Sequence, residues 1–189
     1  MLMNTKRLFL GLDLPSDIKL AITSVIKKLG LAFVGVAWVP ENNLHVTLVF
    51  LGQVAEKTIS LLKTKLATVK PDFPPFMMST HVIKAFPNWE KCQVIIIELA
   101  NNPFFNKLVE QYQQTLKQIP EIKMAIRRNI TPHITIGRVK KELLVIEKNQ
   151  PSEMPKLKWE INSVTLYESR LQNNQPPKYL PLENYHISE

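Results

Sequence analysis

The segment His45-Val46-Thr47-Leu48 has a near copy later in the chain, His133-Ile134-Thr135-Ile136. In each segment a polar side chain alternates with an apolar one. Because successive side chains of a β-strand point to opposite faces, each segment should place an imidazole and a hydroxyl on one face. The two apolar side chains of each segment would then point into a core. Two such strands predict two similar lobes that meet at a shared polar surface.

The rest of the chain predicts further strands and helices around these two segments. Apolar residues at positions 18, 21, 22, 25, 26 and 29 have helical spacing, with Ser16 as a candidate N-cap and Gly30 as the end. Asn102 and Pro103 are typical of the start of a third helix. The expected strands are 7–14, 36–39, 45–51, 76–83, 94–99, 130–139, 159–169 and 179–187, and the expected helices are 18–29, 59–69, 105–119 and, as a short one, 141–148.

This order predicts an α+β fold, with two antiparallel β-sheets and flanking helices around a central groove. We expect a single domain over residues 1–189, built from two pseudo-symmetric lobes. The length of 189 residues and the 45% content of hydrophobic residues suit one compact domain.

Composition narrows the classes of protein further. No apolar run approaches the roughly 20 residues that a membrane span needs, and the single cysteine, Cys92, cannot form an internal disulfide. We therefore expect a cytoplasmic protein with no membrane association and no obligate protein partner. The net charge of +8 would attract phosphate-bearing ligands, although a surface rich in lysine explains the charge equally well.

The two imidazoles and two hydroxyls suit phosphoryl transfer without a metal. A neutral imidazole can take a proton from water while a protonated one donates a proton to the leaving oxygen. The hydroxyls of Thr47 and Thr135 can donate hydrogen bonds to phosphoryl oxygens, and Arg138 can hold another such oxygen with its planar fork of donors. The other histidines, His81 and His186, lack this context and are read as structural or surface residues.

In combination, five stretches of this chain resemble the two-histidine (2H) phosphoesterases, specifically the LigT-like RNA 2′,3′-cyclic phosphodiesterases of bacteria and archaea, once described as 2′-5′ RNA ligases. The stretches are RLFLGLDLP (7–15), WVPENNLHVTLVFLGQV (38–54), AFPN (85–88), TPHITIGRV (131–139) and VTLYESRL (164–171). One departure is the run Val94-Ile95-Ile96-Ile97, where the family often has a tryptophan.

The resemblance implies a role for each residue of the two motifs. It makes His45 the proton donor and His133 the proton acceptor, and it makes Thr47 and Thr135 binding groups for phosphate. Arg138 is expected to contact the phosphate or the ribose. Phe50 is carried over as a base-stacking aromatic, although simple alternation along the strand favours a place in the core.

The implied substrate is RNA with a 2′,3′-cyclic phosphate end, or a cyclic nucleotide, and the implied product is a 2′-phosphomonoester. No cofactor and no metal is expected. Three alternatives remain open: an RNA-end binding protein without turnover, a 2′-5′ RNA ligase, and a metallohydrolase that uses the histidines as ligands. Two histidines with threonines, and no carboxylate in either motif, make a poor ligand set for zinc. For Arg7 the sequence leaves open a place in the groove or at an exposed strand start.

Overall fold

A computed structural model describes residues 4–126, 130–145, 154–173 and 175–187. The described helices are α1 (Ser16–Ala32), α2 (Glu56–Leu66), α3 (Pro103–Leu116) and a short 3-10 helix, η1 (Glu41–Asn43). The strands are β1 (Thr5–Leu12), β2 (Phe33–Trp38), β3 (Val46–Ala55), β4 (Phe76–Phe86), β5 (Val94–Leu99), β6 (His133–Val145), β7 (Lys158–Ile161), β8 (Ser163–Gln172) and β9 (Gln175–His186).

The strands form one nine-stranded sheet in the order β7-β4-β5-β6-β3-β1-β8-β9, with β2 paired to β6. All of its described ladders are antiparallel. Within the described residues, the ladder between β3 and β6 holds a single pair, Val46 opposite Ile134. The predicted α+β class is confirmed, and the two predicted sheets are the halves of one sheet that is joined at this pair.

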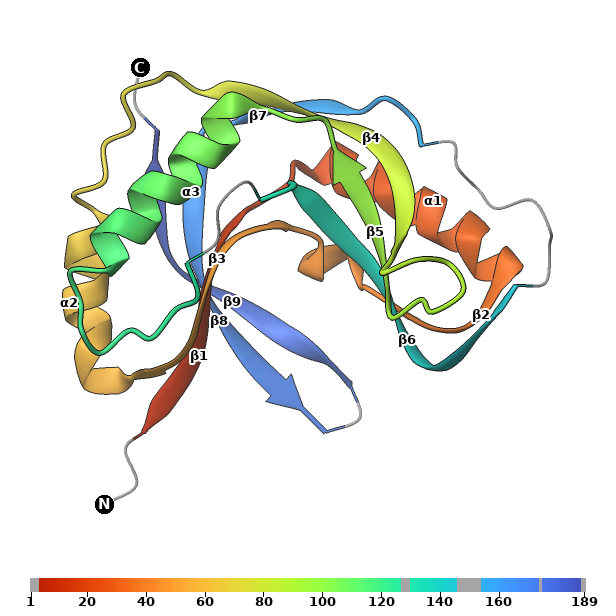
Figure 1. Ribbon diagram of the computed structural model, residues 1–189, viewed down its shortest axis with the longest axis horizontal. Helices are drawn as coiled ribbons and strands as arrows, with labels where there is room; N and C mark the ends of the chain where they lie inside the picture. The colour runs from red at the N-terminus through yellow and green to blue at the C-terminus, as the bar shows by residue number, and fades with distance from the viewer. Residues whose placement is uncertain (1–3, 127–129, 146–153, 174, 188–189) are drawn as a thin grey trace.

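The sheet curls into an arch, and the helices cover its outside (Figure 1). Helices α2 and α3 lie beside the half that contains β1, β3, β8 and β9, whereas α1 lies behind the half that contains β2, β5 and β6. The opposite face of the sheet, which we call the inner face, is not covered by the described helices. None of the described helices has the length and apolarity required to cross a bilayer.

Helix α1 shows why the outside of the sheet is the core. Its residues Ile18, Ile22, Ile26 and Leu29 are buried, and they follow the spacing of one helical face. The predicted start of α3 is also confirmed, because the Asn102 side chain accepts a hydrogen bond from the backbone N–H of Phe104 at 2.8 Å.

Three expectations about local structure were wrong. Ser16 lies inside α1, where Pro15 is the N-cap residue. The helix expected over 141–148 is strand as far as Val145, because these residues pair with β2 (Val145 opposite Phe33), and 146–148 lie outside the described residues. The strand expected over 159–169 is broken at Asn162 into β7 and β8, which pair with different partners at distant places in the sheet.

Candidate active site

The two motif histidines are held in the same way. The Nδ1–H of His45 donates to the backbone carbonyl of Asn43 at 2.7 Å, and the Nδ1–H of His133 donates to the carbonyl of Thr131 at 2.9 Å. A carbonyl oxygen can only accept, so each hydrogen bond fixes the tautomer with the proton on Nδ1. In each neutral ring Nε2 is therefore the basic atom available for proton transfer.

The single pair that joins the halves of the sheet also brings the two motifs together. His45 and Thr47 flank Val46, and His133 and Thr135 flank Ile134, which lies opposite Val46. The Thr47 hydroxyl lies 3.0 Å from Nε2 of His45 and can donate to it when the ring is neutral. The structure therefore places the two motifs on neighbouring strands, one on either side of this pair.

Burial lowers the pKa of His45 below its usual value of 6.5, because the surrounding side chains exclude the water that would solvate the imidazolium. The hydrogen bond to Asn43 and the charge of Asp13 oppose this effect, while the charge of His133 adds to it. The two imidazoles therefore lie within Coulombic reach of each other.

A β-bulge in β3 turns Phe50 to the inner face. Thr47 lies opposite Gly11 and Val49 lies opposite Leu10, so the intervening Leu48 has no partner on β1. The extra residue reverses the alternation after it and places Phe50 opposite Phe9, on the face of Thr47. Phe50 is 56% exposed, so the expectation of core packing was wrong.

The second motif carries a bulge at the equivalent position. On β6, Thr135 lies opposite Ile96 and Gly137 lies opposite Ile95, so Ile136 has no partner on β5. Arg138 then falls on the face of Thr135, opposite Val94, although simple alternation from Thr135 would place it on the other face. Each motif thus presents a histidine, a threonine and, five positions after the histidine, a third side chain to the same face.

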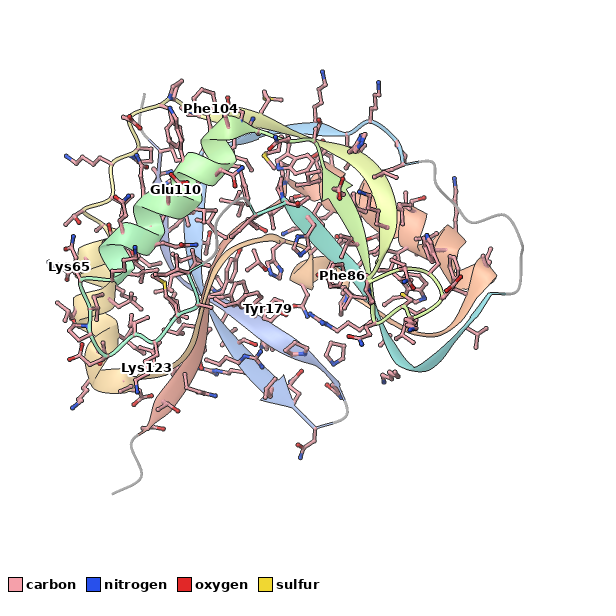
Figure 2. All side chains as sticks on the ribbon, in the orientation of Figure 1. Lys65, Phe86, Phe104, Glu110, Lys123 and Tyr179 are labelled. Carbon is pink, nitrogen blue, oxygen red and sulfur yellow. The ribbon has the colours of Figure 1, made fainter. Side chains whose placement is uncertain are left out.

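Three aromatic side chains surround His45. The ring of Phe9 lies 4.9 Å from it, between centroids, and Tyr179 meets it edge-on at 5.2 Å. Tyr167 stacks on Phe9 at 5.1 Å and lies 6.3 Å from the His45 ring. Burial in this cluster raises the pKa of Tyr167 to about 12, so its hydroxyl keeps its proton at neutral pH. Figure 2 shows Tyr179 inside the arch.

Gly11 and Asn43 position His45, although the sequence analysis assigned neither residue a role in the site. A Cβ at Gly11 would lie 3.2 Å from the carbonyl oxygen of Val46 and 3.4 Å from Cδ2 of His45. Asn43, whose carbonyl holds the ring, donates from its side-chain amide to the carbonyl of Pro177 at 2.7 Å and so ties β9 to the site. Of these two, only Gly11 had a signal in the sequence, as a glycine inside a predicted strand.

Residues 12–96 match the family described as LigT like Phosphoesterase. A curated relative from Archaeoglobus fulgidus, named RNA 2′,3′-cyclic phosphodiesterase, is 32% identical over 138 residues, which are 72% of this chain and 74% of that protein. A relative of the same name from Methanocaldococcus jannaschii is 30% identical and aligns over 90% of this chain and 95% of its own length. The chain belongs to the LigT-like phosphoesterase family.

Solved structures agree with this membership at the level of the fold. Escherichia coli LigT, crystallised with 3′-AMP, superposes with a TM-score of 0.79 at 22% identity and covers 98% of this chain and 100% of that one. A protein from Thermus thermophilus gives 0.78 at 25% identity, with 96% of this chain and 97% of that one covered. The resemblance to LigT-like phosphoesterases drawn from the sequence is confirmed.

Proposed function

We propose that this protein hydrolyses the 2′,3′-cyclic phosphate at the end of an RNA to a 2′-phosphomonoester, by acid–base catalysis with His45 and His133 and without a metal ion. The observation that carries the proposal is the matched pair of imidazoles. Each donates Nδ1–H to the carbonyl two residues earlier, so Nε2 is the atom that can exchange a proton with the substrate, which in His45 takes the place of the Thr47 hydroxyl. The name shared by the relatives, RNA 2′,3′-cyclic phosphodiesterase, supports the choice of substrate.

In this mechanism His133 acts as the base. Its Nε2 takes a proton from a water molecule as the water oxygen attacks phosphorus, and the bond from phosphorus to the 3′-oxygen breaks in line with the attack. His45, in its protonated form, donates a proton from Nε2 to the departing 3′-oxygen. One water is consumed, one P–O bond forms and one breaks, and the phosphate remains on the 2′-oxygen.

The lowered pKa of His45 agrees with the role of acid. Desolvation makes its imidazolium a stronger acid than a solvated one. The negative charge of the bound cyclic phosphate would favour the protonated form until the proton is transferred. Release of the 3′-oxygen rather than the 2′-oxygen follows from the family resemblance, since the two histidines alone do not select an oxygen.

The remaining inner-face residues would bind the substrate. Thr47 and Thr135 can donate hydrogen bonds to the non-bridging oxygens, whose charge must be stabilised in the transition state. Arg138, turned to this face by the bulge, can hold a phosphate or ribose oxygen. Phe50 is exposed on the same face and offers a flat apolar surface on which a base can stack.

The test is product analysis with a short RNA that ends in a 2′,3′-cyclic phosphate, read by phosphorus NMR against authentic 2′- and 3′-phosphate standards. We expect the 2′-phosphate as the single product, with activity that survives EDTA. His45→Ala and His133→Ala should each abolish turnover without loss of folding, whereas His186→Ala, an exposed histidine of β9, serves as the matched control.

Two of the alternatives have their own signature in this experiment. Binding of the cyclic end without turnover would indicate an RNA-end binding protein. Loss of activity on chelation, with rescue by a divalent ion, would indicate a metallohydrolase. A dominant 3′-phosphate would refute the assignment of His45 as the donor to the 3′-oxygen.

A further inference from the structure

On the inner face, a second cluster of polar groups lies next to the histidine site. Arg7 and Phe9 are two positions apart on β1 and so share a face, and the Phe9 ring contacts both His45 and Tyr179. Arg7 and Ser169 flank the pair of Leu8 and Glu168, which places them on adjacent strands. Ser169 in turn lies opposite Tyr179. Arg7 and Tyr179 therefore lie on either side of β8, and on the inner face.

Positive charge acts on the Tyr179 hydroxyl from both halves of the sheet. The charges of Arg138 and Arg7 partly offset the rise in its pKa that burial causes. In the proposed mechanism Arg138 holds the reacting phosphate or its ribose, so Arg7 is the arginine left beside Tyr179 for a second ligand.

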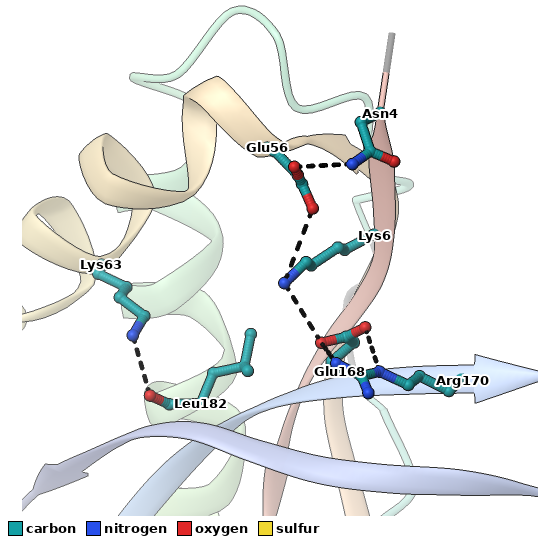
Figure 3. A network of polar contacts seen from close by, with 7 residues as sticks. All are labelled: Asn4, Lys6, Glu56, Lys63, Glu168, Arg170 and Leu182. Carbon is teal, nitrogen blue, oxygen red and sulfur yellow. Dashed lines mark hydrogen bonds and ion pairs between the residues drawn. The ribbon is translucent and has the colours of Figure 1, made fainter. Parts of the chain in front are cut away.

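On the outer face of the sheet, opposite the inner face, the cations have a carboxylate as counter-ion. Glu168 lies 3.6 Å from Nζ of Lys6 and 2.7 Å from Nε of Arg170, so one buried carboxylate balances both (Figure 3). Among the described residues, neither Arg7 nor Arg138 has a carboxylate within ion-pair distance. Lys6 and Arg7 are neighbours on β1 but point to opposite faces. Within the described part of the chain, Lys6 has a carboxylate counter-ion and Arg7 has none.

We propose that Arg7 and Tyr179 form a second anion site, which binds the phosphate on the 5′ side of the terminal nucleoside, while the cyclic phosphate lies between His45 and His133. This inference rests on the proposed function. A guanidinium group and a phenolic hydroxyl offer donors near neutral pH, which is what a phosphodiester requires. The edge of one aromatic ring, Tyr179, separates this site from His45, so a neighbouring phosphate of the same strand is the natural occupant.

The proposal predicts a preference among three substrates that share the reacting group. Adenosine 2′,3′-cyclic phosphate lacks the second phosphate, its 5′-phosphorylated form has the phosphate alone, and the dinucleotide ApA with a cyclic end has the phosphate and an upstream base. We expect kcat/KM to be about tenfold higher for both phosphate-bearing substrates than for the first, which corresponds to one charge-assisted contact.

Arg7→Gln should reduce this preference to about twofold or less, because it removes one guanidinium from the second site. It should also flatten the dependence of log kcat/KM on log salt for ApA by about 0.7, the slope assigned to one phosphate contact on a single strand. The matched control is Arg170→Gln, two strand positions from Glu168 on the outer face, which should keep the wild-type preference. Tyr179→Phe should weaken the preference in the same direction as Arg7→Gln.

A binding experiment separates this inference from the proposed function. Isothermal titration calorimetry with adenosine 2′,5′-bisphosphate and adenosine 2′-monophosphate requires no turnover. We expect the bisphosphate to bind about tenfold more tightly to the wild type and this advantage to fall in Arg7→Gln. The second anion site would be overturned if the wild type bound the bisphosphate no more tightly than the monophosphate, or if Arg7→Gln kept the full wild-type difference. Either result would count even where hydrolysis is normal. If the advantage is present but no cyclic phosphate is hydrolysed, the second site stands and the proposed function fails.

Discussion

Gly11 leaves the space that the His45 ring occupies, and Gly11→Ala tests how tightly this space sets the position of the histidine. The added Cβ would lie 3.2 Å from the carbonyl oxygen of Val46, 3.3 Å from the Phe9 ring and 3.4 Å from Cδ2 of His45. The Val46 carbonyl belongs to a residue of the strand pairing that holds the two halves together, so it can move only slightly. The side chains of Phe9 and His45 must therefore give way by a few tenths of an ångström.

Two opposing effects on stability act in this variant, and the unfavourable one is the larger. Replacing glycine inside a strand gains about 0.5–1 kcal/mol, because alanine has less conformational freedom to lose on folding. Crowding a packed site costs about 1–3 kcal/mol. The net loss of up to about 2.5 kcal/mol would lower the Tm by no more than about 10 °C for a chain of this size.

Catalysis should respond more strongly than stability. A shift of the imidazole disturbs its hydrogen bonds to Asn43 (2.7 Å) and Thr47 (3.0 Å), and with them the line of proton transfer. Because a misplacement of about 1 Å can cost about a hundredfold, we expect kcat to fall about tenfold for a shift of a few tenths.

The assay is hydrolysis of the cyclic phosphate by the folded variant, with the Tm measured in parallel. The matched control is Gly30→Ala in α1, where the new Cβ would meet only Nε1 of Trp38, at an ordinary 3.5 Å. This control should raise the Tm and leave kcat unchanged. Wild-type kcat in folded Gly11→Ala would refute the reasoning that Gly11 positions His45.

Three further predictions address stability, packing and substrate binding. Because the pKa of His45 is lower in the folded protein than its usual 6.5, the unfolded chain binds more protons below that pH, so the free energy of unfolding should fall as the pH drops through this region. We expect the free energy of unfolding in urea to differ less between about pH 5 and about pH 7.5 for His45→Gln than for the wild type. An equal difference in the two proteins would contradict the lowered pKa. Gly137→Ala should destabilise the protein by about 1–3 kcal/mol in the same assay, since its Cβ would lie 2.6 Å from Val36 and 3.0 Å from Trp38. Phe50→Ala should raise KM for the cyclic substrate about tenfold with little change in kcat, because the variant loses about 1.4 kcal/mol of base stacking. An unchanged KM would argue against stacking on this ring.

The sequence predicted which side chains of the two motifs share a face better than it predicted the paths of the strands that carry them. Alternation correctly placed His45 with Thr47 and His133 with Thr135, because the first three residues of each motif lie before the bulge. It failed for Phe50, since an extra residue in β3 reverses the faces and no local signal marks that residue.

Long-range pairing explains the other failures. The residues after Val139 have enough polar character to suggest a short helix, but β2 offers them a strand partner from more than a hundred positions earlier. The break at Asn162 likewise depends on β7 and β8 finding partners at different places in the sheet. Neither effect is local, so neither could be derived from periodicity.

Within the described residues, a single residue pair between β3 and β6 joins the two halves of the sheet. In any rotation of one half of the sheet against the other, atoms near the axis move least and atoms far from it move most. His45 and His133, the proposed proton-transfer groups, flank this pair, whereas Phe86 (Figure 2) and the far ends of β8 and β9 (Figure 1) lie away from it. A rotation about this pair would therefore change the width of the arch more than the distance between the two imidazoles.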